Sequence, residues 1–282
     1  MEPSKKTDPV KIRIHDLHKS FGSKVVLDGV NVDVAPAESL VVIGGSGTGK
    51  SVLLKHIIGL LRPDSGTVEV DGIAVEKLGN REITEFRRKF GMAFQEGALF
   101  DSMTVWQNVA FPLQRLTRMS RGEINDRVEE CLAMVRLEGV GEKLPSQLSG
   151  GMRRRVGFAR AVAHQPEILL FDEPTTGLDP VTTALIDEVI LDLSDRLKTT
   201  TITITHDMES AFRIGDRIAM LNRGKIIAEA PPEEFKRLDD PRVQQFIHGQ
   251  AEGPLSEEGG GPRDTRDRLG SKVGESGVPN RP

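Results

Sequence analysis

One glycine-rich segment limits what this chain can fold into more than any other feature. Residues Gly44–Ser51 read GGSGTGKS and match the phosphate-loop pattern G-x-x-x-x-G-K-[ST] at every defined position. The short apolar run Ser39–Ile43 precedes the segment, and the run VLLKHIIGLL, apolar on a helical period, follows it. We therefore predict a buried strand, a loop whose backbone N–H groups bind phosphate, and a helix that begins near Lys50.

The residue types in this loop have separate predicted tasks. Lys50 is expected to reach the β- and γ-phosphates of a nucleotide, and Ser51 is expected to ligate Mg²⁺. A glycine-rich turn without a ligand is the alternative, but the strand before the loop and the helix after it argue against that reading. The residues predicted to bind the phosphates are Gly44, Gly45, Ser46, Gly47, Thr48, Gly49, Lys50, Ser51 and Val52.

Two adjacent acids stand at the end of another apolar run. Asp172 and Glu173 directly follow Ile168–Phe171, which has the length of a buried strand. Burying two carboxylates is costly without a partner, and Mg²⁺ is a suitable one. We expect Asp172 to hold the metal and Glu173 to act as general base or to position the attacking water. Taken alone, the pair fits two solvated acids at a strand end equally well.

Strand and helix patterns alternate around a block that is mostly helical, from about residue 103 to 148. Pro112 and Pro145 are expected to interrupt that block. The alternation predicts an α/β core with an inserted helical subdomain. Further strands are expected at 11–17, 25–34, 67–70 and 201–205, a hairpin at 216–228, and helices at 121–137, 153–164 and 181–197.

The composition narrows the classes of function. The net charge of −4 and a sequence pI near 5.9 do not favour a nucleic-acid binder, and the single cysteine, Cys131, excludes an internal disulfide framework. The apolar runs are too short to cross a bilayer, and no apolar stretch follows the first lysines as in a signal peptide. The chain is therefore expected to work at a membrane, if at all, from outside the lipid. The segment after Gly249, rich in Gly, Pro, Ser and charge, is predicted to be disordered.

A third motif completes a recognisable set. The sequence LSGGM, Leu148–Met152, together with the phosphate loop, the Asp-Glu pair and the histidine of TITITHD, resembles the ABC ATPase family over about residues 11–238. The resemblance implies a P-loop NTPase core with an inserted helical subdomain (about 96–155) and an N-terminal antiparallel β subdomain, in a nucleotide-binding domain spanning 8–238. It also implies roles for Phe21 on the adenine, Gln95 on Mg²⁺, Ser149, Gly150 and Gly151 on the ATP of a partner subunit, Asp179 in the dimer loop, and His206 as γ-phosphate sensor.

Simpler interpretations exist for three of these residues. Ser149 is a good helix cap, a role that is compatible with binding an anion. His206 alone would be read as a histidine at the edge of the core. Phe21 beside a glycine would be read as packing.

The signature also points to a subgroup. Met152 stands where most family members have glutamine, and methionine cannot donate a hydrogen bond. Methionine at this position, the segment 94–113 and the segment 240–254 resemble the ATPases of Mce-type lipid transporters, including the Mla phospholipid system. This implies a C-terminal extension, 239–254, that contacts the neighbouring ATPase, followed by a disordered tail, 255–282. It further implies a permease, a STAS-domain subunit and an Mce-domain protein as partners, at the cytoplasmic face of the bacterial inner membrane.

One chain carries one phosphate loop and one LSGG, so two complete ATP sites require a head-to-tail homodimer. The apolar residues Ala98-Leu99-Phe100 and Trp106 are read either as a groove for the permease or as the core of the helical subdomain. An ATPase for another substrate, such as amino acids, is the main alternative. A non-transport ABC protein of DNA repair or translation is the weaker one, because only about one hundred residues without sustained heptads separate the two motifs and the chain has a single cassette.

Overall fold

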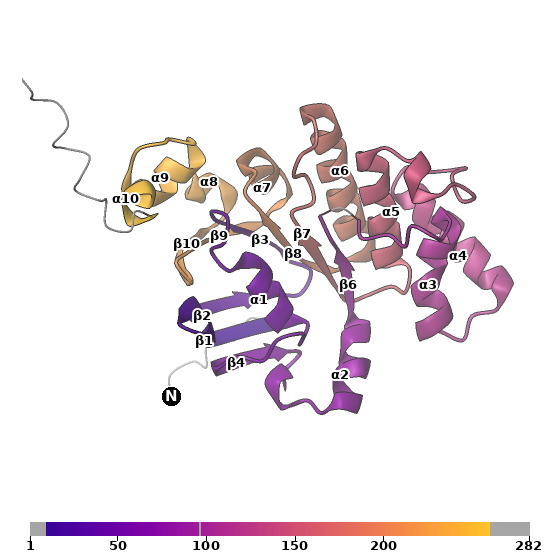
Figure 1. Ribbon diagram of the computed structural model, residues 1–282, viewed down its shortest axis with the longest axis horizontal. Helices are drawn as coiled ribbons and strands as arrows, with labels where there is room; N and C mark the ends of the chain where they lie inside the picture. The colour runs from indigo at the N-terminus through magenta and orange to yellow at the C-terminus, as the bar shows by residue number, and fades with distance from the viewer. Residues whose placement is uncertain (1–9, 96, 260–282) are drawn as a thin grey trace, which may run out of the picture. The chain divides into compact units, whose positions relative to one another are not determined.

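The chain divides into two compact units. The structure, a computed structural model, describes residues 10–95 and 97–259 (Figure 1). Contacts within the chain separate a larger unit that ends at Arg237 from a smaller unit that begins at Leu238. Each unit is described by itself.

An antiparallel sheet forms the N-terminal part of the larger unit. Its strand order is β2-β1-β4-β5, and β1 pairs antiparallel with both β2 and β4. A two-residue turn, Asp71-Gly72, joins β4 to β5, and both residues have positive φ (51° and 74°), as a tight hairpin requires. The strands are β1 (Ile12–Phe21), β2 (Lys24–Val34), β4 (Ser65–Val70) and β5 (Ile73–Ala74).

A second, six-stranded sheet forms the centre of the unit, in the order β10-β9-β3-β8-β7-β6. All neighbours pair parallel except β9 and β10, which form the predicted hairpin. Because β3, β6, β7 and β8 run in one direction, their carboxyl ends meet at one edge, where ligands bind in such sheets. The strands are β3 (Ser39–Ile43), β6 (Phe90–Ala93), β7 (Ile168–Asp172), β8 (Thr200–Thr205), β9 (Arg217–Asn222) and β10 (Lys225–Ala230).

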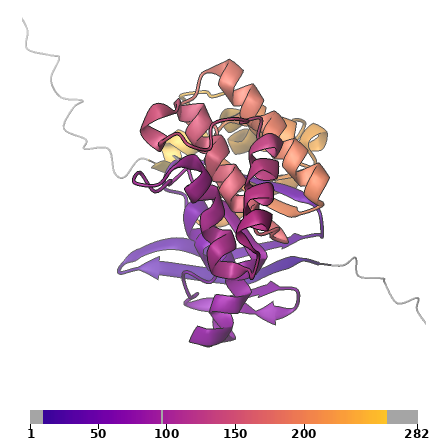
Figure 2. The same ribbon diagram turned by 90° about the vertical axis from the view of Figure 1, so that its right-hand side faces the viewer.

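Helices cover both faces of the central sheet. Figures 1 and 2 show α3, α4 and α5 gathered into one group, with α5 packed beside β6. The α-helices of the larger unit are α1 (Lys50–Ile57), α2 (Asn80–Phe86), α3 (Val105–Leu116), α4 (Arg121–Met134), α5 (Gly150–Val162), α6 (Pro180–Leu197), α7 (Met208–Ile214) and α8 (Pro232–Phe235). Short 3-10 helices lie at Val75–Lys77, Arg87–Lys89 and Pro145–Gln147. The smaller unit contains α9 (Pro241–Ile247) and α10 (Pro254–Gly259).

The alternating residues of the buried strands supply two cores. Leu40 and Val42 of β3 join Leu54 of α1 and the apolar residues of the antiparallel sheet in one cluster. On a different side of the sheet, Phe171 of β7 meets Phe158 of α5 edge-on, with ring centroids 5.0 Å apart. Both faces of the sheet are therefore buried from solvent, which explains the nearly continuous apolar runs of its strands. The predicted α/β fold, with an antiparallel sheet and a helical group, is confirmed.

Several details differ from the prediction. Pro112 does not interrupt the helical pattern but lies inside α3, because the buried face of Val105, Val109 and Leu113 holds the helix together despite one missing hydrogen bond. Helix α5 begins at Gly150 rather than near 153, because the Ser149 side chain caps it. The pattern did not indicate α2, β6 or α7.

The predicted disorder after Gly249 is wrong for residues 254–259, which form α10. The buried side chain of Gln245 ties this segment down: its Oε1 accepts from the Leu255 amide (2.8 Å), and its Nε2 donates to Ser256 Oγ (2.9 Å). The rest of the predicted tail, and residues 1–9, lie outside the described residues. None of the helices within the described ranges is long and apolar enough to cross a bilayer.

Candidate active site

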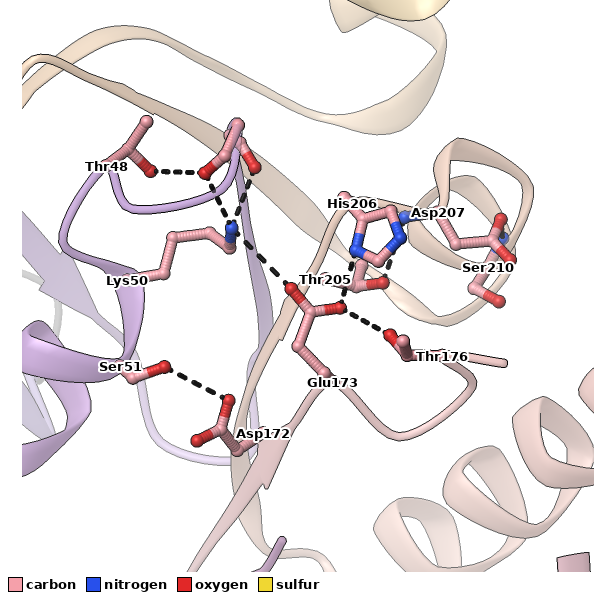
Figure 3. Close-up of polar contacts among 12 residues, drawn as sticks. Thr48, Lys50, Ser51, Asp172, Glu173, Thr176, Thr205, His206, Asp207 and Ser210 are labelled. Atoms are coloured by element: carbon pink, nitrogen blue, oxygen red, sulfur yellow. Dashed lines mark hydrogen bonds and ion pairs between the residues drawn. The ribbon is translucent and has the colours of Figure 1, made fainter. Parts of the chain in front are cut away.

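The phosphate loop lies between β3 and α1, at the carboxyl edge of the central sheet. Gly44 has φ +151°, and a Cβ at this position would stand 2.3 Å from the carbonyl oxygen of Leu221, so only glycine fits. The buried ammonium of Lys50 donates to the carbonyl oxygens of Gly44 (2.7 Å) and Gly45 (3.1 Å), and Thr48 Oγ1 donates to Gly45 (2.9 Å; Figure 3). The loop thus brings a cation and the first amides of α1 to one place, which suits a polyphosphate.

The strand-end carboxylates face this loop from β7. Ser51 Oγ donates to Asp172 Oδ1 at 3.3 Å. Burial raises the pKa of Asp172, the Ser51 hydrogen bond opposes that rise, and the charge of Glu173 adds to it. A hydroxyl and a carboxylate oxygen side by side are the donors that Mg²⁺ takes, so these two residues fit the ion.

Glu173 is the meeting point of three other groups. Its carboxylate Oε2 lies 2.9 Å from His206 Nδ1 and accepts from Thr176 Oγ1 at 2.9 Å, and Oε1 lies 3.6 Å from Lys50 Nζ (Figure 3). The backbone of Glu173 has φ +51°, a left-handed conformation that is costly for a residue with a side chain. Three residues therefore hold one mostly buried carboxylate: Lys50 after β3, His206 after β8, and Thr176 in the same turn as Glu173.

The signature residues are placed elsewhere. Ser149 caps α5 by accepting from the Met152 amide (3.3 Å), and Gly150 begins the helix. Figure 1 shows α5 well apart from α1, and no hydrogen bond of the described residues joins Ser149, Gly150 or Gly151 to the phosphate loop. One chain therefore presents the two motifs at separate places.

Asp179 caps the next helix. Its Oδ1 accepts from the amides of Val181 (3.1 Å) and Thr182 (3.0 Å), and its Oδ2 accepts from Thr182 Oγ1 (2.6 Å). The Thr182 hydroxyl is the main reason that the pKa of Asp179 is lowered. The carboxylate is exposed at the N-terminus of α6, next to the segment that links it to Glu173.

Two predicted residues do not join the central cluster. The Phe21 ring is 49% exposed at the end of β1, with Lys19 Nζ 5.6 Å from its centroid. Gln95 is exposed after β6, and within the described residues its side chain makes no hydrogen bond to Ser51 or Asp172. Its backbone carbonyl instead accepts from Arg154 Nε at 2.6 Å.

Sequence reasoning missed two residues that contact the candidate active site. Thr176 bonds to Glu173, and Arg154 bonds to the backbone of both Gln95 and Thr176. The only signal was the run of three arginines after the signature, which does not reveal which one points inward.

Comparison with known proteins identifies this arrangement. The family model described as ABC transporter matches residues 27–176, which include the phosphate loop, the signature and the Asp-Glu pair. The chain belongs to the ABC transporter family. It is an ATP-binding, ATP-hydrolysing subunit of a transporter.

Individual relatives agree with the family assignment. The chain is 43% identical over 246 residues to the probable ribonucleotide transport ATP-binding protein mkl of Mycobacterium tuberculosis, covering 87% of this chain and 68% of the relative. It is 38% identical over 244 residues to the intermembrane phospholipid transport system ATP-binding protein MlaF of Haemophilus influenzae, covering 86% of this chain and 92% of MlaF. A solved dimeric ATP-binding cassette in a post-hydrolysis state with ADP and phosphate is 34% identical, with a TM-score of 0.71, over 78% of this chain and 98% of that one.

Proposed function

We propose that this chain is the ATPase subunit of a transporter that moves phospholipids between membranes. The observation that carries the proposal is its similarity to MlaF over 92% of the length of that protein. Met152 at the end of the signature and the segments 94–113 and 240–254, which resemble the Mce-type subgroup, support it. The chain then works at the cytoplasmic face of the bacterial inner membrane, bound to a permease, with an Mce-domain protein and a STAS-domain subunit as further partners.

In this function the phosphate loop binds ATP. Lys50 turns from the carbonyl oxygens of Gly44 and Gly45 to the β- and γ-phosphates, which are stronger acceptors for an ammonium. Phe21, exposed at the end of β1, stacks on the adenine. Ser51 and Asp172, with Gln95, hold Mg²⁺, which when bound neutralises charge on the phosphates.

Glu173 orients the attacking water and accepts its proton. Its hydrogen bonds with His206 and Thr176 aim the carboxylate before the nucleotide arrives, so little reorganisation remains for the reaction. His206 is exposed beside Glu173, and in the closed state it donates to the γ-phosphate. Lys50 and His206 together stabilise the charge of the transferred group.

Hydrolysis needs two copies of the chain. Because the phosphate loop and the signature lie apart in one chain, Ser149, Gly150 and Gly151 complete the ATP site of a partner in a head-to-tail homodimer. The exposed Asp179 lies at that interface. The nucleotide-binding domain spans 8–238, with a helical subdomain of about 96–155, and the extension 239–254 contacts the neighbouring ATPase. The similarity to a solved dimeric cassette supports this assembly.

The permease docks on an apolar patch of the helical subdomain, formed by Phe100 and Phe111. Phe100 is 42% exposed, its ring centroid is 4.9 Å from that of Phe111, and the Arg160 guanidinium lies 5.8 Å from the Phe100 ring. An exposed aromatic ring that packs on a second, half-buried ring beside a cation suits a short amphipathic helix. Trp106 is partly buried and donates to Asn125 Oδ1 at 3.1 Å, which favours the interior of the subdomain for this residue.

The catalytic proposal is tested with Glu173→Gln. The amide keeps the shape of the side chain but cannot take a proton, so ATP turnover should fall about 10²- to 10⁴-fold while ATP binding persists. Glu138→Gln, on the exposed surface, is the matched control and should keep wild-type turnover. A Glu173→Gln variant with more than a tenth of wild-type turnover would remove Glu173 from this role.

The docking proposal is tested with Phe100→Asp. The variant should fold and hydrolyse ATP alone, yet lose co-purification with the permease. Leu60→Asp, at an apolar residue outside the helical subdomain that is exposed to a similar extent, should keep the permease. Insoluble protein would instead assign Phe100 to the core. Normal permease binding would show that the permease docks on a different surface.

The substrate is tested by affinity purification of the tagged chain from detergent-solubilised membranes, with identification of its partners by mass spectrometry. A permease together with an Mce-domain protein, and phospholipid in the complex, is the expected result. Nucleotide transport is the second candidate, favoured by the 43% identity to mkl, and recovery of a permease that binds ribonucleotides would establish it instead.

A further inference from the structure

Arg154 occupies a junction between the signature helix and the candidate active site. It lies in the second turn of α5 and is only 7% exposed. Its Nε donates to the backbone oxygen of Gln95 at 2.6 Å, and its Nη2 donates to the backbone oxygen of Thr176. Gln95 follows β6 and Thr176 follows β7, so one guanidinium holds two loops of the active site against the helix that the signature begins.

The contact at Thr176 continues to the catalytic carboxylate. The Thr176 hydroxyl donates to Glu173 Oε2 at 2.9 Å, and the Thr176 amide lies 3.5 Å from the Glu173 carbonyl oxygen. Glu173 has φ +51°, so its position depends on the contacts of this turn. Arg154 and Thr176 therefore form a continuous chain of hydrogen bonds from α5 to the Glu173 side chain.

The neighbouring arginines of α5 reach other places. Arg153 donates to the Leu148 carbonyl oxygen (2.7 Å), and Arg155 donates to the carbonyl oxygens of Val135 (3.2 Å) and Arg136 (2.9 Å). Arg160 donates to Gly97 and Ala98, beyond Gln95. Among the described residues of α5, only Arg154 donates a hydrogen bond to the turn that holds Glu173.

We propose that Arg154 is a positioning residue that couples the two ATP sites of the homodimer. The inference rests on the proposed function, in which Ser149, Gly150 and Gly151 bind the partner's ATP and Glu173 acts on the ATP of its own chain. When the partner's ATP draws in the N-terminus of α5, Arg154 moves the Thr176 turn with it and aligns Glu173. Each site then becomes competent only when the other is occupied, and turnover depends cooperatively on ATP.

Arg154→Lys in the full-length chain tests the coupling. Lysine keeps the charge but is a single-point donor that cannot reproduce the planar fork between two carbonyl oxygens. We expect the maximal turnover to fall about tenfold, the ATP concentration at half-maximal turnover to change less than about twofold, and the Hill coefficient to fall from above 1 to about 1. Arg155→Lys is the matched control: its guanidinium also binds two backbone oxygens, but both lie in the helical subdomain, so turnover and Hill coefficient should stay as in wild type.

A double-mutant cycle tests the route through Thr176. Thr176→Val removes the hydroxyl that binds Glu173, and Thr176→Ser keeps it. If Arg154 acts through this turn, Arg154→Lys should lower turnover less than about twofold further in the Thr176→Val background, yet close to tenfold in the Thr176→Ser background. Should the Arg154→Lys protein fail to fold, the two Thr176 variants test the route without it. The Hill coefficient must then fall to about 1 in Thr176→Val and stay above 1 in Thr176→Ser.

Several outcomes overturn the inference. They are a wild-type Hill coefficient of 1, an Arg154→Lys variant that behaves like Arg155→Lys, and multiplicative effects of Arg154→Lys and Thr176→Val. Glu173→Gln, measured in parallel, separates this from a failure of the proposed function. If that variant has lost turnover while Arg154→Lys has not, only the coupling is wrong; if Glu173→Gln still turns over ATP, the proposed catalytic role is wrong.

Discussion

The buried carboxylate of Asp187 links α6, the helix that follows Asp179, to α7, the helix that follows His206. Asp187 of α6 is fully buried, and its Oδ2 accepts from Ser210 Oγ (3.0 Å) and Arg213 Nη1 (2.6 Å) of α7. Its Oδ1 has no hydrogen-bond partner in the described ranges. Burial raises the pKa of Asp187 from 3.8 to about 6, against the opposing effects of the Ser210 hydrogen bond and the Arg213 charge. The perturbation that tests this account is Asp187→Asn.

The size and sign of the effect follow from proton linkage. Between about pH 4 and pH 6 the folded chain keeps a proton that the unfolded chain has released, so wild-type stability from this group is fully present below pH 4 and is lost as pH rises through 6. A difference of about 2 pKa units between the folded and unfolded chain corresponds to roughly 3 kcal/mol in the free energy of unfolding. Of this, the wild-type chain loses about 2–3 kcal/mol between pH 4 and pH 7. Asparagine does not titrate, so the Asp187→Asn variant should gain that amount relative to wild type over this interval.

Urea unfolding followed by circular dichroism measures the difference. The free energy of unfolding is determined for both proteins at intervals from pH 4 to pH 7, without nucleotide and at low protein concentration, because the sequence pI is near 5.9. Asp195→Asn, at an exposed acid of the same helix, is the control, because that carboxylate is hydrated in both states. If the wild-type and Asp187→Asn curves run parallel to within about 0.5 kcal/mol, the carboxylate is solvated in the folded state and the reasoning fails.

Three further substitutions test the packing around the site, each by urea unfolding. Phe158→Ala should cost about 3–5 kcal/mol, because it removes the edge contact with Phe171 inside the core, and a loss below about 1 kcal/mol would show that the core closes over the gap. Gly91→Ala places a methyl 2.2 Å from the Ala161 carbonyl oxygen and should cost about 1–3 kcal/mol, unless α5 can move away from β6 without penalty, in which case stability would be unchanged. Ser149→Ala should cost about 1 kcal/mol through loss of the α5 cap, and Ser149→Asn should restore it; equal losses in both variants would assign the effect to something other than capping.

The residues that sequence reasoning located best are those whose chemistry depends on near neighbours in the chain. Lys50 and Ser51 lie at the start of a helix that follows a strand, and Asp172 and Glu173 end a strand, so local pattern alone places each pair. Phe21 and Gln95 were assigned from the family pattern and lie apart from the central cluster, and their contacts with nucleotide and metal stay predictions.

The sequence alone determined the α/β class, most of the central strands, the phosphate loop and the carboxylate pair, because these arise from side-chain period and from backbone geometry within a few residues. It did not indicate α2, β6 or α7, which are short elements whose pattern is set by their packing. It did not determine which of three consecutive arginines points inward, or that Thr176 and His206 meet on Glu173. A helix turns about 100° per residue, so Arg153, Arg154 and Arg155 point in three directions, and only the packing of α5 against β6 and α6 decides which of them reaches the active site. The contacts at Glu173 join residues up to 123 positions apart, since Lys50 and Glu173 come together only when β3, β7 and β8 align their carboxyl ends in one sheet.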